Sequence, residues 1–197
     1  MTPIRKILFN RIKQIIDYWP IEDQYAISFF VYTNESYEYS GYSNVPYFAI
    51  SYNTDSQCDT DDSYGEERWN YAFWPQNESV IIDTAQLTPE TEHLFSWYRD
   101  IGLENIGFED PTNAYDKHMR YIGKGPVGLA ELLEVITDIA AELQQTGYIE
   151  KKFGKKLPII IHDLEYTWYM IEATRKANKH GEADVFLQAM SDLGFCD

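Results

Sequence analysis

One short segment holds most of the side chains in this sequence that could do chemistry. Its six carboxylates, with no lysine or arginine between them, are Asp55, Asp59, Asp61, Asp62, Glu66 and Glu67. The aromatic cluster RWNYAFW follows directly at 68–74. Carboxylates at this density could bind a metal ion, act as general acid and base, or form a surface for a positively charged partner.

A calcium or zinc site is not what the residue spacing predicts. An EF-hand loop that starts at Asp55 needs glycine at its sixth position for the tight turn, and Thr60 stands there. We also expect a strand, not a helix, before Asp55. Zinc prefers grouped cysteines and histidines, whereas these residues are scattered: Cys58, His93, His118, His162, His180 and Cys196. We therefore expect no metal and no cofactor.

No complete catalytic constellation is present. The sequence lacks a G-x-S-x-G nucleophile elbow, a P-loop and a G-x-G-x-x-G after a strand. GKGPVG at 123–128 opens a helix and could bind an anion, but glycine and proline are common turn and first-position residues there. The best cluster is HDLE at 162–165, where His162 is expected to end a buried strand and Asp163 to cap the next helix. A hydrolase-like enzyme with a site near His162 stays open as an alternative.

The charge of the chain favours cationic partners. The net charge is −16 for 23.1 kDa, and the residues between Lys13 and Arg68 include eleven acidic side chains and no basic one. Such a surface repels nucleic acid and anionic lipid, because contacts to phosphate need lysine and arginine. It attracts cationic proteins, although a high net charge also serves solubility alone. We expect no nucleic-acid or membrane partner.

The same sequence features indicate a cytoplasmic protein. Two cysteines, Cys58 and Cys196, suggest a reducing compartment rather than a disulfide framework. The basic, partly apolar N-terminus lacks the apolar core and cleavage site of a signal peptide. No stretch approaches the ~18 uninterrupted apolar residues of a membrane span.

The aromatic cluster after the acids predicts one buried and one exposed set of rings. On a helix over 64–74, Trp69 and Phe73 share a face that would pack in the core, with Arg68 neutralising its acidic neighbours. Rings on the other faces would be rigid anchors inside an acidic rim, a mixture that protein interfaces favour. The expected partner-binding residues are Asp55, Asp59, Asp61, Asp62, Tyr64, Glu66, Glu67, Tyr71 and Trp74.

Apolar periodicity predicts one α+β domain over 1–197, with a small, largely antiparallel or mixed sheet of three to five strands under about five helices. Expected strands are 25–33, 45–53, 78–83 and 157–162, the first two as an antiparallel hairpin around a turn at 34–44. Expected helices are 3–18, 64–74, 88–102, 126–146, 163–178 and 182–191. An irregular loop at 105–125 and a basic turn at 150–156 connect them.

Capping residues set the expected helix ends. Ser63 with Glu66 has capping-box spacing, and Thr88 precedes Pro89 at a first helical position. Pro126 is expected to lead the long apolar helix, and Gly147 to close it.

Four stretches carry a resemblance to a known family: YAISFFVYTNE (25–35), YNTDSQ (52–57), ERWNYAFWPQN (67–77) and LPIIIHDLEY (157–166). They resemble an uncharacterised bacterial family of soluble, acidic proteins of about this length, over essentially the whole chain and in order. ERWNYAFW is the most specific block. Such families look like the immunity proteins of bacterial polymorphic toxin systems, which are small, acidic, cytosolic, catalytically inert and toxin-specific. The resemblance implies this role and supplies neither a catalytic residue nor a fold.

The residues and the resemblance together predict a non-catalytic immunity or inhibitor protein. It would occlude a cognate, cation-rich, nuclease-like toxin domain, since enzymes that cut a polyanion are basic around their active sites. An acidic surface would speed arrival and aromatic anchors would slow departure. A structural or adaptor module that self-associates through an apolar patch is a further alternative, and the oligomeric state is left open.

Overall fold

The fold is built on a four-stranded mixed sheet, as the sequence predicts. The computed structural model describes residues 3–34, 45–75, 77–83, 88–109 and 111–195. The strands are β1 (Gln24–Asn34), β2 (Val45–Thr54), β3 (Ser79–Ile82) and β4 (Ile159–His162), in the order β3-β2-β1-β4. β1 and β2 form the expected antiparallel hairpin, β3 adds antiparallel to β2, and β4 runs parallel to β1. The turn expected at 34–44 lies outside the described residues, apart from Asn34 at the end of β1.

β1 separates two cores because its side chains alternate between the faces of the sheet. Ile27, Phe29 and Val31 point into one core, here called the main core, and Ala26 and Phe30 point into the other. β4 lies beside β1 and is buried along its whole length. A strand that is covered on both faces has a continuous run of apolar residues in its sequence. The prediction that LPIIIH contains such a strand is therefore confirmed.

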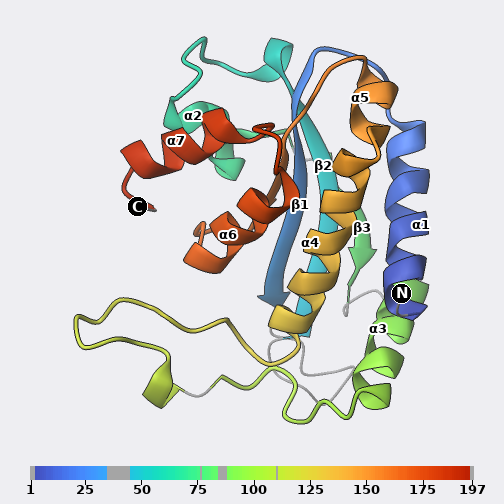
Figure 1. Cartoon of the computed structure of the whole chain (residues 1–197), viewed down its shortest axis with the longest axis vertical. Helices are drawn as coiled ribbons and strands as arrows, with labels where there is room; N and C mark the ends of the chain where they lie inside the picture. The colour runs from blue at the N-terminus through green and yellow to red at the C-terminus, as the bar shows by residue number, and fades with distance from the viewer. Residues whose placement is uncertain (1–2, 35–44, 76, 84–87, 110, 196–197) are drawn as a thin grey trace.

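The main core lies between the sheet and four helices, which Figure 1 shows along one side of the strands. They are α1 (Pro3–Tyr18), α3 (Pro89–Asp100), α4 (Leu129–Gln145) and α5 (Tyr148–Phe153). The apolar stripes of α1 and α4 face the sheet, as their three- and four-residue spacing predicts.

The second core, here called the aromatic core, fills the other face of the sheet under α2 (Glu66–Trp69) and α7 (Asp184–Asp192). α6 (Trp168–Ala177) borders both cores, with Met170 in the main core and Ile171 in the aromatic core. The rings that fill the aromatic core are Tyr25, Phe30, Trp69, Tyr71, Trp74, Tyr166 and Phe186.

Seven α-helices occur in the described part of the chain: one at each of the six ranges predicted as helical, and α5 in addition. α5 forms where the sequence predicts a basic turn, and it follows α4 through Gly147, whose φ of 66° reverses the chain. The long helix α4 begins at Leu129, after Gly128, rather than at Pro126. Gly128 has a φ of 98°, which favours glycine, and its backbone N–H donates to Glu131 Oε2 at 2.9 Å.

Two expected N-caps are wrong for the same reason, a local side-chain bond that favours a turn. Ser63 does not cap α2, because Asp62 accepts the Tyr64 N–H in a local turn and the helix starts only after Gly65. α2 ends at Trp69, where Asn70 accepts a bond from the Ala72 N–H and starts a 3₁₀ turn at Tyr71–Phe73. Asp163 accepts bonds from the backbone N–H groups of Glu165 and Thr167, so α6 starts only at Trp168. The Thr88 cap of α3 is confirmed.

Residues 105–125 form the expected irregular connection. Figure 1 shows this segment projecting beyond the end of the sheet. Its described residues hold a 3₁₀ turn at Pro111–Asn113 and an antiparallel bridge between Tyr115 and Tyr121.

Removing a side chain from the main core should destabilise the whole domain. Ile136 of α4 is fully buried there. Ile136→Ala should lower the free energy of unfolding by about 2–5 kcal/mol, because it removes buried methyl groups and leaves a cavity. Urea denaturation followed by circular dichroism measures this change. The control is Ile101→Ala, whose side chain is half exposed, and its effect should stay within about 0.5 kcal/mol. Equal effects for both variants would contradict the assignment of the main core.

Candidate functional site

The acidic segment, residues 55–67, leaves the end of β2 and is tied to the start of β1. The Asp55 backbone N–H donates to the carbonyl oxygen of Asp23 at 3.1 Å, and the Ser56 N–H donates to Asp23 Oδ2 at 2.7 Å. A 3₁₀ turn at Asp55–Gln57 follows. The segment therefore begins from a fixed point on the sheet.

Arg68 fixes the other end of the acidic segment. Its Nη2 lies 2.6 Å from Asp55 Oδ1, and its guanidinium carbon lies 3.8 Å from the centre of the Tyr25 ring. The Tyr25 hydroxyl donates to the Arg68 carbonyl oxygen at 2.6 Å. Arg68 thus pairs with one acid of the segment and stacks on the sheet, which closes residues 55–67 into a loop with both ends held.

Trp69 and Trp74 support the segment from below. Trp69 Nε1 donates to the Ser63 carbonyl oxygen, and Trp74 Nε1 to that of Arg68, both at 2.8 Å. Tyr25 meets the Trp69 ring edge to face, with centres 5.6 Å apart. Buried indole groups that hydrogen-bond to the loop backbone restrict its conformations.

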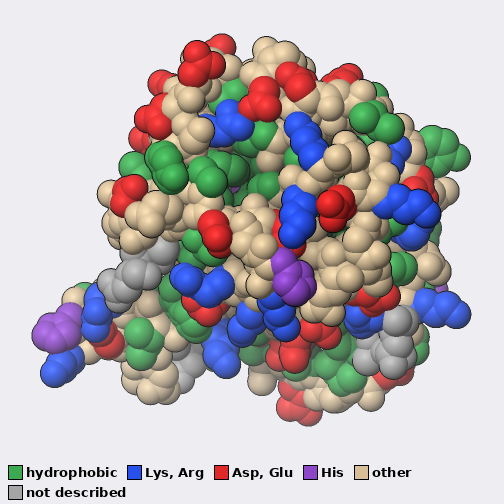
Figure 2. All heavy atoms as spheres, turned by 45° about the horizontal axis from the view of Figure 1, so that its top comes forward, with side chains coloured by type: hydrophobic (Ala, Val, Ile, Leu, Met, Phe, Trp, Pro, Cys, Tyr) green, Lys and Arg blue, Asp and Glu red, His purple; other side chains and the backbone are tan. Residues whose placement is uncertain are grey.

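The structure brings seven of the nine expected site residues onto one surface. The six carboxylates are exposed and Tyr64 is half exposed. Asp62 accepts the Tyr64 N–H and Glu66 accepts the Asn70 amide. Within the described residues, the carboxylates of Asp59, Asp61 and Glu67 have neither a hydrogen bond nor an ion pair. Figure 2 shows acidic side chains gathered at the upper left of the molecule, on the side of α2 and the segment before it.

The expectation that Tyr71 and Trp74 are exposed anchors is wrong. Tyr71 is 5% and Trp74 is 3% exposed. Tyr71 stacks on Phe30 with ring centres 4.5 Å apart, and its hydroxyl donates to Glu78. Phe73, expected in the core, is 57% exposed, whereas Trp69 is buried as expected. The expectation assumes a regular helix to residue 74. The chain instead turns after Trp69, so the rings that follow point in other directions than they would on a helix.

His162 is sealed in the aromatic core. It has no exposed surface, and its ring stacks against Phe30 and Tyr166 at centre distances of 5.3 and 5.7 Å. Nδ1 lies 3.1 Å from the carbonyl oxygen of Asp163 and Nε2 lies 2.7 Å from Ser28 Oγ. A carbonyl only accepts, so Nδ1 carries the proton and Nε2 accepts from the serine. Burial lowers the pKa of His162 to about 4. The neighbouring serine and histidine have no surface that a substrate could reach.

Open grooves lie elsewhere on the described part of the chain, and two of them border α6. One of about 560 Å³ runs between α4 and α6, and its lining mixes lysines with acids. The other, of about 450 Å³, lies between the end of β1, the 105–125 connection and the start of α6. Sequence reasoning missed both, because their residues come from separated segments without a common motif.

The described residues contain no group of three or more histidine, cysteine, aspartate or glutamate side chains placed to hold a metal ion. Among the described helices, none combines the length and the apolar character needed to cross a bilayer.

Comparisons with protein-family models, with curated proteins and with solved structures found no match. The resemblance to toxin-immunity families therefore stays a prediction.

Burial of neutral His162 should make stability depend on pH. Its pKa is about 4 in the fold and about 6.5 when unfolded, so the unfolded chain binds more protons between these values. Stability is then full above pH 6.5 and falls as the pH drops toward 4, by about 3 kcal/mol. His162→Gln, which keeps a polar group beside Ser28, should lose this part of the pH dependence. Denaturant unfolding of both proteins at pH 7 and pH 4.5 tests it, and equal pH dependences would contradict the assignment.

Proposed function

We propose that this chain is a non-catalytic immunity or inhibitor protein that binds a cation-rich toxin domain through the acidic segment and acts in the cytoplasm. The observation that carries the proposal is the state of the six carboxylates: all are exposed, and only Asp55 is in an ion pair within the described residues. Acids that are not consumed by internal contacts are available to a partner. The resemblance to immunity-protein families points to the same role.

The geometry suits recognition of a basic protein surface. Carboxylates spread over an exposed loop give a negative potential that increases the rate of encounter with a cationic partner, most strongly at low salt. Tyr64, half exposed within the acidic segment, adds a ring that can be buried on contact. Occlusion of a nuclease-like site would need no chemistry from the inhibitor.

The buried rings have a different role from the one expected of them. Tyr71 and Trp74 do not contact a partner directly, since both are buried. They belong to the aromatic core on which the acidic segment is mounted. A loop that is already ordered loses less conformational entropy when it binds, and this favours affinity. Slow dissociation would then rest on Tyr64 and on the pre-organised backbone of the acidic segment.

Neither alternative has an observation in its favour. A hydrolase centred on His162 would need an access route, and neither groove is lined by that residue. An adaptor that self-associates would need one continuous apolar face. The large exposed apolar side chains are instead spread over several elements, among them Tyr18 on α1, Phe73 after α2 and Val185 on α7.

Reversing the free charges of the acidic segment should weaken protection. The variant carries Asp59→Lys, Asp61→Lys and Asp62→Lys, and the partner is the toxic domain encoded by the neighbouring gene. Cells that co-express the toxic domain with this variant should not grow. The affinity of the variant for an inactivated toxin domain, measured by calorimetry, should fall at least tenfold, because complementary charges become like charges. The melting temperature should change little, since these side chains are exposed.

The matched control applies the same charge change elsewhere, as Asp100→Lys, Glu104→Lys and Glu150→Lys. These three acids are also exposed and lie on α3, on the connection after it and on α5. The control should keep both protection and affinity. Full protection by the acidic-segment variant, or equal loss in the control, would show that the contact surface lies elsewhere.

A further inference from the structure

A groove lined by tyrosines lies at the end of the sheet opposite the acidic segment. It has a volume of about 450 Å³ and is formed where β1, the 105–125 connection and α6 meet. Tyr32 comes from β1, Tyr115 and Tyr121 from the connection, and Tyr169 from α6. Tyr121 lies near two of the others, with its ring centre 5.4 Å from that of Tyr115 and 6.4 Å from that of Tyr169. This site is here called the tyrosine groove.

Three carboxylates line the tyrosine groove, those of Glu109, Asp163 and Glu165, and its described lining contains no lysine, arginine or histidine. Burial raises the pKa of the Tyr169 phenol, a bond with Thr167 opposes the shift, and the charges of all three acids add to it. The three carboxylates therefore line the same groove as the Tyr169 ring and act on its hydroxyl.

The three acids differ in how far they are already engaged. Glu109 accepts the Tyr121 hydroxyl. Asp163 accepts the hydroxyl and backbone N–H of Thr167 and the N–H of Glu165. The Glu165 carboxylate has no hydrogen bond or ion pair to a described residue, and its residue is exposed. Glu165 is therefore the acid best placed to receive a new donor.

Aromatic faces beside carboxylates match one side chain better than any other. The guanidinium of arginine is planar, stacks on rings, and presents donors in a fork that fits a carboxylate. Lysine offers a point charge without the planar stacking surface. A neutral ligand would leave the negative charge of these carboxylates without a neutralising cation in a partly dehydrated groove.

The rim of the tyrosine groove points to a protein rather than a free small cation. Leu164 is 65% exposed and Tyr115 is 49% exposed, and both line the groove. Ile122, next in the chain to Tyr121, is 53% exposed. Apolar side chains around a charged pocket gain from burial only when a larger surface covers them.

We propose that the tyrosine groove is a second interaction surface, which binds an arginine side chain presented by a partner protein. The acidic segment starts beside Asp23, just before β1, whereas Tyr32 and Thr33 lie near the last residue of this 11-residue strand. At about 3.3 Å per residue the two sites are roughly 30 Å apart. The tyrosine groove can therefore function or fail independently of the acidic segment.

Titration with a short peptide tests the proposal on the full chain. The probe is acetyl-Gly-Arg-Gly-amide, and its matched control is the same peptide with citrulline, which has nearly the same shape without the charge. NMR amide shifts in 105–125 and 163–170 should saturate with the arginine peptide, and the citrulline peptide should bind at least tenfold more weakly. Glu165→Gln should weaken the arginine peptide by roughly tenfold.

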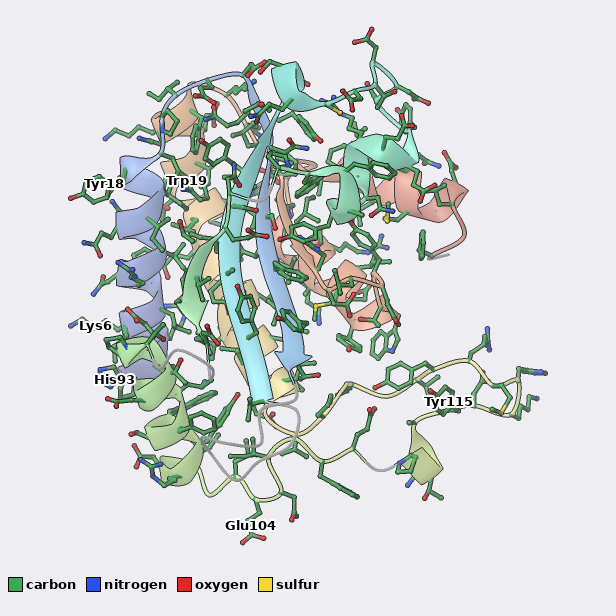
Figure 3. All side chains as sticks on the ribbon, turned by 180° about the vertical axis from the view of Figure 1, so that it is seen from behind. Lys6, Tyr18, Trp19, His93, Glu104 and Tyr115 are labelled. Carbon is green, nitrogen blue, oxygen red and sulfur yellow. The ribbon has the colours of Figure 1, made fainter. Side chains whose placement is uncertain are left out.

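Two control variants test whether peptide binding depends on the tyrosine groove or on acidic residues elsewhere. Glu104→Gln removes an exposed charge one residue before the 105–125 connection and outside the tyrosine groove, and it should bind as the wild type does. Figure 3 labels Glu104 at the end of the molecule and Tyr115 on the projecting segment. The variant reversed at Asp59, Asp61 and Asp62 should also bind the peptide normally, so failure of the proposed function is distinguishable from failure here.

Three results would overturn the proposal. They are the absence of saturable shifts, equal binding of the arginine and citrulline peptides, and equal effects of Glu165→Gln and Glu104→Gln. If Glu165→Gln does not fold, Tyr115→Ala replaces it. That side chain is half exposed, and its loss should weaken the arginine peptide at least threefold through the missing stacking surface.

Discussion

β1 must be covered on both faces, and the rest of the fold follows from this constraint. Its side chains alternate between Ile27, Phe29 and Val31 on one face and Ala26 and Phe30 on the other, and all are buried. Four helices cover the first face. The second face needs a separate layer, which the chain supplies from short pieces that include α2, α7 and the start of α6. That layer is rich in rings because few, large side chains must cover much apolar area.

The aromatic layer determines where the acidic segment lies. Trp69 packs edge to face on Tyr25 and also on Phe186 of α7, with centres 5.6 Å apart in each pair. The Tyr166 hydroxyl donates to the Trp69 carbonyl oxygen from the other side. Residues just before Trp69 are therefore held at the molecular surface by buried contacts. The surface acids are held in place by packing beneath them rather than by bonds among themselves.

The sequence predicts elements that many residues specify together, and it fails to predict helix ends that a single side-chain hydrogen bond determines. The strands and long helices follow from repeated apolar spacing, and each is supported by many contacts. The errors at α2 and α6 trace to single side chains, Asn70 and Asp163, whose bonds to nearby N–H groups favour turns. A helix that continued to residue 74 would expose Tyr71 and Trp74, whereas the turn after Trp69 buries both rings. The tyrosine groove could not be predicted, because its lining comes together only when β1, 105–125 and α6 are folded.

The two anionic sites differ in what solvent does to them. The free acids of the segment stand in water, where salt screens their charges beyond about 8 Å at physiological ionic strength. Their main effect is on the rate of encounter. In the tyrosine groove, Glu165 is exposed, but Glu109 and Asp163 are partly buried beside rings that exclude part of the water. The attraction of these two carboxylates is therefore less screened and acts at contact. If both proposals hold, the acidic segment attracts a basic protein and the tyrosine groove selects for an arginine side chain on that protein. Under these proposals, the second surface would let a chain of net charge −16 bind one basic protein in preference to others, since charge alone attracts them all.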